Sequence, residues 1–138
     1  MSISNRKVVI VGAGHVGSHV GYALISQSLA DEIVYIDSDR AKAVAQALDL
    51  TDATNYLPVR TKVTAGDYSD AKDAQIMIIA AGPLPTGNQT RMDTLGQTIA
   101  ILKDVTKSIK ESGFDGIIIS ISNPADVIAH YIQHTLNW

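Results

Sequence analysis

Short apolar runs alternate along the chain with longer segments in which apolar residues recur every three or four positions. The runs are rich in valine, isoleucine and alanine, and most of them are nearly continuous. Such runs are typical of strands that are buried on both faces of a parallel sheet. Strands are therefore predicted at Lys7 to Val11, Glu32 to Ile36, Thr61 to Ala65, Gln75 to Ala80 and Gly116 to Ile121.

Helical spacing occupies the segments between these runs. One helix is predicted to bury the stripe formed by Ala41, Val44, Ala45 and Leu48. A longer helix, which Ser112-Gly113 would end, carries a stripe of Leu95, Ile99, Leu102, Val105 and Ile109. A last helix follows Pro124 and places on one side Val127, Ile128, Tyr131 and Ile132. The alternation predicts a doubly wound α/β fold with a mostly parallel sheet.

Length and composition narrow the class of protein. The 138 residues are enough for one domain with a single core. A net charge of −3 with scattered basic residues argues against nucleic acid as a partner, and the absence of cysteine excludes disulfide and thiolate chemistry. The apolar runs are far too short to span a membrane. We therefore expect a cytoplasmic protein with no nucleic-acid or membrane partner.

A glycine fingerprint lies between the first strand and the helix that follows it. Gly12 allows a sharp turn, Gly14 allows the backbone to approach a pyrophosphate, and Gly17 allows the helix to lie close to the strand. About 20 residues after Gly17, the second strand ends at Asp37, where a carboxylate can accept hydrogen bonds from a ribose diol and repel a 2′-phosphate. The pattern predicts a dinucleotide site that favours NAD over NADP.

The segment from Gly82 to Thr90 is rich in proline and glycine and follows the fourth strand. Ligands in this fold bind beyond the carboxyl ends of the strands, so the segment is a candidate lid, although an ordinary surface loop has the same composition. Arg91 follows this segment directly. Its guanidinium could reach a polarised carbonyl, or it could be a solvated arginine before a helix.

Polar residues also follow the last strand, in Ser122-Asn123-Pro124. Asn123 can donate to a substrate oxygen and accept from a cofactor ribose. Pro124 is equally consistent with a plain strand-to-helix turn, including one with a cis peptide bond.

Two histidine pairs have the one-turn spacing of metal ligands, His15 with His19 and His130 with His134. Neither pair has the intervening glutamate of a metalloprotease or an obvious third ligand. We therefore expect no metal site.

Several short motifs follow one another in a characteristic order: Gly12 to Gly17, Asp37, Gly66-Asp67-Tyr68, Ile78 to Gly82, Thr90 to Asp93 and Ser122 to Asp126. With this order and spacing, the chain resembles the L-lactate/malate dehydrogenase family from about Lys7 to its end. The resemblance implies a Rossmann fold with NAD as cofactor. It also implies that residues 1–138 are the NAD-binding domain and that the C-terminal substrate domain is absent from this chain.

The resemblance further assigns site residues. It implies that the NAD site is lined by Val16, Asp37, Lys42, Tyr68, Gly82 and Pro83. It implies that the nicotinamide ribose is faced by Ile121, Ser122 and Asn123. Asn123 and Arg91 would contact the substrate, with Arg91 polarising the keto group from the closing loop.

Members of this family carry an aspartate–histidine proton relay and a carboxylate-binding arginine in a second half. The four histidines of this chain are all on predicted helices in other places. The resemblance therefore implies the cofactor half of an NAD-dependent L-2-hydroxyacid dehydrogenase, inactive alone, whose substrate is a small 2-oxo or 2-hydroxy acid. The full-length protein is expected to form a homo-oligomer, either a dimer or a tetramer.

Three substrates remain in view: pyruvate first, as in a lactate-type enzyme, then branched 2-oxo acids, as in an L-2-hydroxyisocaproate dehydrogenase, and then oxaloacetate. Malate dehydrogenases place an arginine in the segment occupied here by Leu84-Pro85-Thr86, and Pro85 stands where the substrate side chain is read. An unpaired carboxylate buried there would cost several kcal/mol, so oxaloacetate is disfavoured. A non-catalytic NAD-sensing module is the alternative from another class, but it would have no use for Arg91 or Asn123.

Overall fold

The computed structural model describes residues 5–58, 60–83 and 85–138, and strands alternate with helices throughout these ranges. The first part of the chain forms β1 (Lys7–Val11), α1 (His15–Ser26), β2 (Glu32–Ile36), α2 (Arg40–Thr54) and β3 (Lys62–Ala65). The second part forms the 3-10 turn η1 (Tyr68–Ala71), β4 (Ile76–Ile79), α3 (Leu95–Ser112), β5 (Ile117–Ser120) and α4 (Ala125–Leu136).

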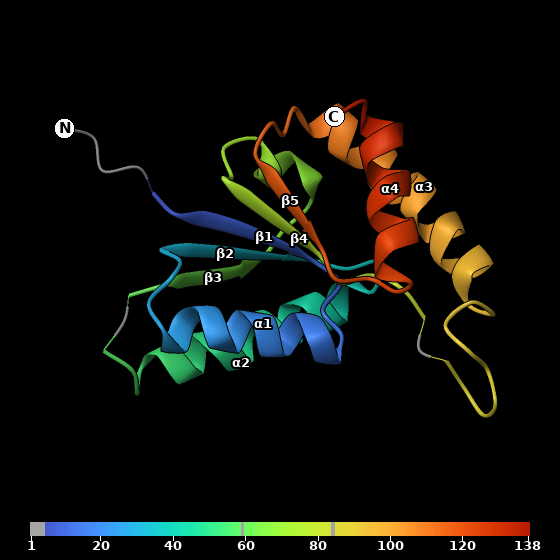
Figure 1. Cartoon of the computed structure of the whole chain (residues 1–138). Helices are drawn as coiled ribbons and strands as arrows, with labels where there is room; N and C mark the ends of the chain where they lie inside the picture. Colours follow the sequence, from blue (N-terminus) through green and yellow to red (C-terminus); the bar gives the residue numbers. More distant parts are fainter. Residues whose placement is uncertain (1–4, 59, 84) are drawn as a thin grey trace.

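The described strands form one sheet in the order β3-β2-β1-β4-β5, and every neighbouring pair is parallel. Helices α1 and α2 cover one face of the sheet, while α3 and α4 cover the other (Figure 1). The chain thus winds outward from β1 in one direction and from β4 in the other, which places the topological switch point between these two strands. The predicted doubly wound parallel fold is confirmed.

Three of the predicted strands extend one or two residues beyond the observed β3, β4 and β5. Some of these flanking residues still take part in the ladder, because the amide of Ala80 donates to Val11 and that of Ile121 donates to Ile79. The discrepancy therefore concerns where each strand is said to end rather than how the chains pair.

The predicted buried face of α2 is wrong. Val44 and Leu48 are 40% and 60% exposed, whereas the residues that pack on the sheet are Ala43, Ala47 and Leu50. The true face lies one residue away, a rotation of about 100° around the helix. The physical reason is packing distance: two small alanines let α2 lie close to β2 and β3, and the bulkier side chains turn toward solvent.

The other two predicted stripes agree better with the structure. In α3, Leu102, Val105 and Ile109 are buried, and Gly113 ends the helix with a positive φ of 74°. In α4, Ile128 and Ile132 are buried, but Val127 is 38% exposed and does not belong to the core. The core is divided by the sheet into one apolar cluster under α1 and α2 and another under α3 and α4.

Candidate functional site

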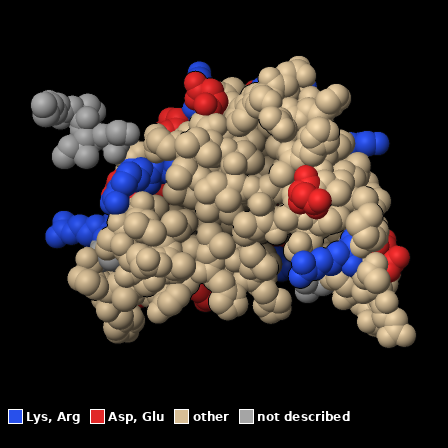
Figure 2. Space-filling view, viewed as in Figure 1, with Lys and Arg blue, Asp and Glu red and all other residues tan. Residues whose placement is uncertain are grey.

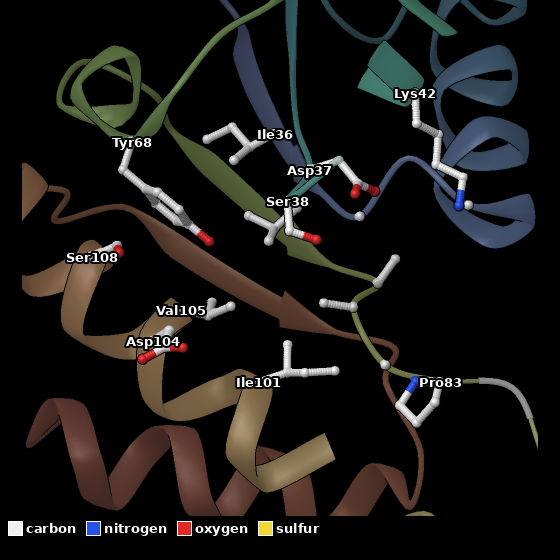
Figure 3. A pocket seen from close by; sticks show the side chains of 16 residues that line it. Ile36, Asp37, Ser38, Lys42, Tyr68, Pro83, Ile101, Asp104, Val105 and Ser108 are labelled. Carbon is white, nitrogen blue, oxygen red and sulfur yellow. The ribbon is translucent and has the colours of Figure 1, made fainter. Parts of the chain in front are cut away.

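A cavity of about 510 Å³ opens at the carboxyl ends of β1, β2 and β4, the edge at which ligands bind in this kind of fold. Its walls come from the glycine loop after β1, the end of β2, the turn η1, the segment after β4 and one side of α3 (Figure 3). Seven residues predicted from the sequence line it: Gly12, Gly14, Asp37, Lys42, Tyr68, Gly82 and Pro83.

The glycine loop is tightly packed at two positions and open at the third. A Cβ on Gly12, which has a φ of +104°, would come within 2.6 Å of the Ala80 carbonyl oxygen. A Cβ on Gly17 would overlap the carbonyl oxygen of Gly12, while one on Gly14 would meet nothing within 4 Å. Gly17 therefore lets α1 lie against the end of β1, Gly12 lets the loop lie against the backbone that follows β4, and Gly14 leaves free space beside the cavity.

A buried tyrosine holds this arrangement from behind. Tyr35 is fully buried in β2, and its hydroxyl donates to the Gly17 carbonyl at 3.0 Å. Burial raises the pKa of this phenol above its usual value of 10, so it stays a neutral donor across the working pH range. The hydrogen bond fixes the first turn of α1, whose leading amides have no acceptor within the helix.

Asp37 is held at the end of β2 by two backbone amides. Its Oδ2 accepts from the amide of Ala13 at 2.7 Å, and its Oδ1 accepts from that of Asp39 at 2.9 Å. Each carboxylate oxygen has about two acceptor positions, so one position on each oxygen is left for a ligand. Asp37 thus links the glycine loop to β2 and still presents acceptors to the cavity.

Lys42 and Tyr68 stand on either side of Asp37 in the cavity (Figure 3). Lys42 lies in the first turn of α2, which Asp39 caps by accepting from the Lys42 amide at 3.3 Å. Burial, with the nearby charge of Asp37, raises the pKa of Tyr68 to about 12. The phenol therefore remains protonated and offers a neutral donor beside two charged side chains.

Nine cavity residues were not predicted as site residues. Five of them lie within two positions of predicted residues along the chain, namely Val11, Ile36, Ser38, Ala80 and Ala81. The other four lie on α3: Ile101, Asp104, Val105 and Ser108. Their spacing of i, i+3, i+4 and i+7 is a helical stripe of its own, next to the buried one. The helical spacing was visible in the sequence, but two of the four residues are polar, and the position of α3 beside η1 depends on the tertiary fold.

Arg91 and Asn123 come together although 32 positions separate them in the sequence. Arg91 Nη1 donates to Asn123 Oδ1 at 3.3 Å, and both side chains are exposed. Arg91 lies in a turn that Asp93 closes, since its Oδ2 accepts from the Thr90 amide at 2.6 Å and from the Thr90 hydroxyl at 2.8 Å. These bonds hold the pKa of Asp93 below its usual range. The pair thus presents a guanidinium and a carboxamide together.

The residues around this pair connect it to the cavity. The Ser122 hydroxyl is buried and donates to the Ala81 carbonyl at 2.6 Å, which ties the end of β5 to the segment that leads to Gly82. The Asn123–Pro124 peptide bond is cis. Ile121 and Asn123 flank Ser122 outside the cavity proper. Ser122 therefore acts through internal hydrogen bonds that position its neighbours.

Between Gly82 and α3, the described residues form turns at residues 87–88 and 91–94, and α3 begins at Leu95. Gly82 and Gly87 have positive φ values of 151° and 58°. Leu84, which the sequence analysis included in the candidate lid, lies outside the described residues. The prediction that this segment closes as a lid stays a prediction.

Val16 does not line the cavity. Its side chain is 51% exposed and lies on the outer surface of α1, where it borders an apolar groove together with His15 and His19. Both predicted histidine pairs do lie on helices, α1 and α4. Among the residues that the structure describes, no group of three or more metal-ligating side chains is present.

The surface agrees with the sequence-based view of its charge. On the face seen in Figure 2, acidic and basic side chains are scattered among large neutral areas. No helix in the described ranges is long and apolar enough to cross a membrane.

Comparison with known proteins identifies similar chains. The profile of a family described as lactate/malate dehydrogenase, NAD binding domain, matches residues 6–137. L-lactate dehydrogenase 3 of Bacillus cereus is 43% identical over 132 residues, and L-lactate dehydrogenase 1 of Bifidobacterium longum is 42% identical over 131 residues. These matches cover 96% and 95% of this chain but 42% of each relative, so the chain spans less than half of their length.

Solved structures give the same picture. The minor L-lactate dehydrogenase of Enterococcus mundtii in its ligands-bound form is similar with a TM-score of 0.92 at 37% identity. The lactate dehydrogenase of Cryptosporidium parvum, solved with lactic acid and NAD, is similar with a TM-score of 0.90 at 27% identity. Each similarity covers 98% of this chain and 43% of the other chain.

Proposed function

Because this chain belongs to the lactate/malate dehydrogenase family as its NAD-binding domain, we propose that residues 1–138 are the cofactor half of an NAD-dependent L-lactate dehydrogenase. The observation that carries the proposal is the contact between Arg91 and Asn123 beside the cofactor cavity. A module that only senses NAD would need the glycine loop and Asp37 but would gain nothing from this pair. The similarity to several L-lactate dehydrogenases supports the lactate-type assignment.

The cavity fits a dinucleotide along its length. The open space beside Gly14 and the unpaired amides of the first turn of α1 suit a pyrophosphate. The two free acceptor positions of Asp37 suit the hydroxyls of the adenosine ribose. Since the Val16 side chain points to the outer surface, we infer that this residue contributes through its backbone amide. Lys42 would add a positive charge near the phosphates.

The nicotinamide half of the cofactor would lie toward the end of β5. Pro83 and the carboxyl end of β4 form the wall of the cavity on that side. The hydrogen bonds of Ser122 would hold Ile121 and Asn123 beside the ring and its ribose. When bound, the nicotinamide would supply the chemistry, giving a hydride as NADH to the keto carbon of a 2-oxo acid or taking one as NAD⁺ from the 2-hydroxy acid.

Arg91 and Asn123 would act on the substrate oxygen. As the keto carbon takes up a hydride, negative charge develops on this oxygen and is stabilised by the guanidinium and the carboxamide N–H. The proton donor and the group that binds the substrate carboxylate would come from outside residues 1–138. We therefore expect this chain alone to show no turnover of pyruvate with NADH. A homo-oligomer of the full-length protein also stays a prediction.

The experiment that tests the proposal replaces Arg91 by glutamine in the full-length enzyme. We expect Arg91→Gln to lower kcat by at least about 10²-fold, the typical effect of removing one donor to a developing oxyanion. NADH affinity, measured on residues 1–138, should change less than about twofold. Arg60→Gln, a matched substitution of another exposed arginine, should leave both values unchanged. If Arg91→Gln mainly weakens NADH binding, the role assigned to it is wrong.

The same enzyme separates the candidate substrates. Pyruvate or 2-oxoisocaproate should exceed oxaloacetate by at least about 10²-fold in kcat/KM, roughly 2.7 kcal/mol, because the segment from Gly82 to Thr90 contains no basic residue. A preference for 2-oxoisocaproate would favour an L-2-hydroxyisocaproate dehydrogenase. A preference for oxaloacetate would favour a malate dehydrogenase and contradict the lactate-type assignment.

A further inference from the structure

One end of the cavity is a slot between η1 and α3. In the proposed binding mode Asp37 marks the ribose position, and the slot lies at the end of the cavity away from Pro83 (Figure 3). Its walls carry the ring of Tyr68 and the apolar side chains of Ile101 and Val105 (Figure 3). A flat, weakly polar group fits such walls, and in the proposed binding mode that group is the purine base of the dinucleotide.

The α3 wall of the slot also carries two polar side chains. Asp104 and Ser108 line the cavity one helical turn apart, on the same stripe as the apolar pair. Asp104 takes part in none of the side-chain hydrogen bonds or ion pairs found among the described residues. Neighbouring Lys107 pairs with Glu111 instead, at 4.0 Å. Asp104 is thus a carboxylate at the purine end of the cavity with its acceptor positions open.

A carboxylate at this place has a chemical consequence. A dinucleotide is an anion, so a further negative charge in its site is unfavourable unless it makes a compensating contact. An ionised carboxylate can only accept hydrogen bonds. The exocyclic amino group of adenine donates, whereas a purine with an oxygen at the same position presents an acceptor. Facing the edge of the base that carries N7 and the 6-position, Asp104 would therefore attract the first base and repel the second.

We propose that Asp104 reads the purine of the cofactor, accepting a hydrogen bond from the adenine amino group and disfavouring dinucleotides whose base carries a 6-oxo group. This inference rests on the proposed function, in which NAD occupies the cavity. Ser108 makes no such distinction, because its hydroxyl can rotate to donate or to accept. The specificity of the purine end then comes from one residue on the surface of α3.

The test uses the chain as it is, residues 1–138, titrated at constant ionic strength with NADH and with reduced nicotinamide hypoxanthine dinucleotide. The unmodified chain should bind NADH at least about tenfold more tightly, since a site built for a hydrogen bond discriminates against an analogue that lacks the donor. In Asp104→Asn the ratio should fall to within about twofold, because an amide both donates and accepts. Asp104→Ala should also lose the discrimination.

Glu111→Gln is the matched control, since it removes the same charge from α3 outside the cavity. It should keep the ratio of the unmodified chain. Equal binding of the two dinucleotides to the unmodified chain would overturn the inference, as would an Asp104→Asn variant that changes both affinities by the same factor. A chain that binds neither dinucleotide would overturn the proposed function and this inference together, so the two failures are distinguishable.

Discussion

The two ends of the ligand-binding edge are built differently. At the adenosine end, Asp37 accepts from two backbone amides, and Gly12 and Gly17 lie in close contact with the neighbouring backbone. At the end proposed to hold the nicotinamide, Arg91 is exposed on a turn and donates to Asn123 through one hydrogen bond of 3.3 Å. The first end is formed by the ends of strands and the start of a helix, and the second by side chains from turns.

The difference teaches how binding and chemistry are divided in this domain. The backbone and the sheet fix the groups that would recognise the adenosine half, so these need little rearrangement when a ligand binds. The groups that would act on the substrate are exposed side chains joined by one hydrogen bond, and we expect them to be fixed only when the site is completed. Cofactor recognition should therefore be present in this chain by itself, whereas catalysis should not.

The largest expected effect on stability concerns the packed glycine loop. A glycine-to-alanine change within a helix normally stabilises it by about 1 kcal/mol. At Gly17, however, the new Cβ would overlap the carbonyl oxygen of Gly12, and overpacking of this kind costs about 3 kcal/mol. Gly17→Ala should therefore lower the free energy of unfolding by roughly 2 kcal/mol or more, as measured by urea denaturation. A stability equal to that of the unmodified chain would contradict the close packing of α1 on β1.

Gly14→Ala is the contrasting change in the same loop, because the new Cβ would meet nothing within 4 Å. Its backbone conformation, with φ of −77°, is open to alanine, so the free energy of unfolding should change by less than about 0.5 kcal/mol. NADH affinity should nevertheless fall by at least about tenfold, since the methyl group would occupy the space that faces the ligand. If the variant binds NADH as tightly as the unmodified chain, the pyrophosphate does not lie beside Gly14.

Another test measures how tightly the unmodified chain binds each half of the dinucleotide. Adenosine diphosphate ribose carries the half that the preformed end would bind, so its affinity for this chain should lie within about tenfold of that of NADH. Reduced nicotinamide mononucleotide should bind at least about 10²-fold more weakly than NADH, a difference of about 2.7 kcal/mol. Calorimetric titration gives all three values. Equal binding of the two half-ligands would show that the contrast between the two ends is wrong.

The smallest effect concerns the phenols of the adenosine end. The pKa of Tyr68 is raised to about 12 and that of Tyr35 is raised as well, in both cases mainly by burial. Because the folded pKa exceeds the unfolded value of about 10, their contribution to stability is complete below pH 10 and is lost as the pH rises toward 12. Urea midpoints should therefore fall as the pH rises from about 10 toward about 12.

Tyr68→Phe should make this fall less steep, whereas Tyr56→Phe should not, because Tyr56 is 91% exposed. Comparing the two variants separates the phenols from the lysines, which lose charge in the same pH range. An identical pH dependence in both variants would contradict the burial of Tyr68 as the cause.

The parts of the molecule that depend on local sequence were predictable, and those that depend on distant packing were not. Continuous apolar runs predicted the parallel strands, and the glycine spacing with Asp37 predicted where the cavity lies. The buried face of α2 was misassigned by one residue, because the pattern favoured the larger Val44 and Leu48 while the sheet accepts the smaller alanines. No local pattern could show that the packing distance between α2 and the sheet decides which face of α2 is buried.

The candidate site shows the same limit. Local sequence gave no sign that Arg91 and Asn123 meet; only the family resemblance implied that both contact the substrate, and the fold brings their side chains within 3.3 Å. The residues of α3 that include Asp104 have helical spacing in the sequence. They line the cavity only because α3 packs beside η1, which the sequence does not show. Val16 lies in the fingerprint, yet its side chain faces away from the cavity.

The central claim is that this chain alone recognises NAD through Asp37, and the most direct measurement is the ratio of its affinities for NADH and NADPH. Asp37 should gain charge-assisted hydrogen bonds worth roughly 1.5–3 kcal/mol each from the free ribose and should repel a 2′-phosphate. We expect NADH to bind at least about tenfold more tightly, and Asp37→Ala to narrow this ratio. Equal affinities of the unmodified chain for the two cofactors would contradict the account.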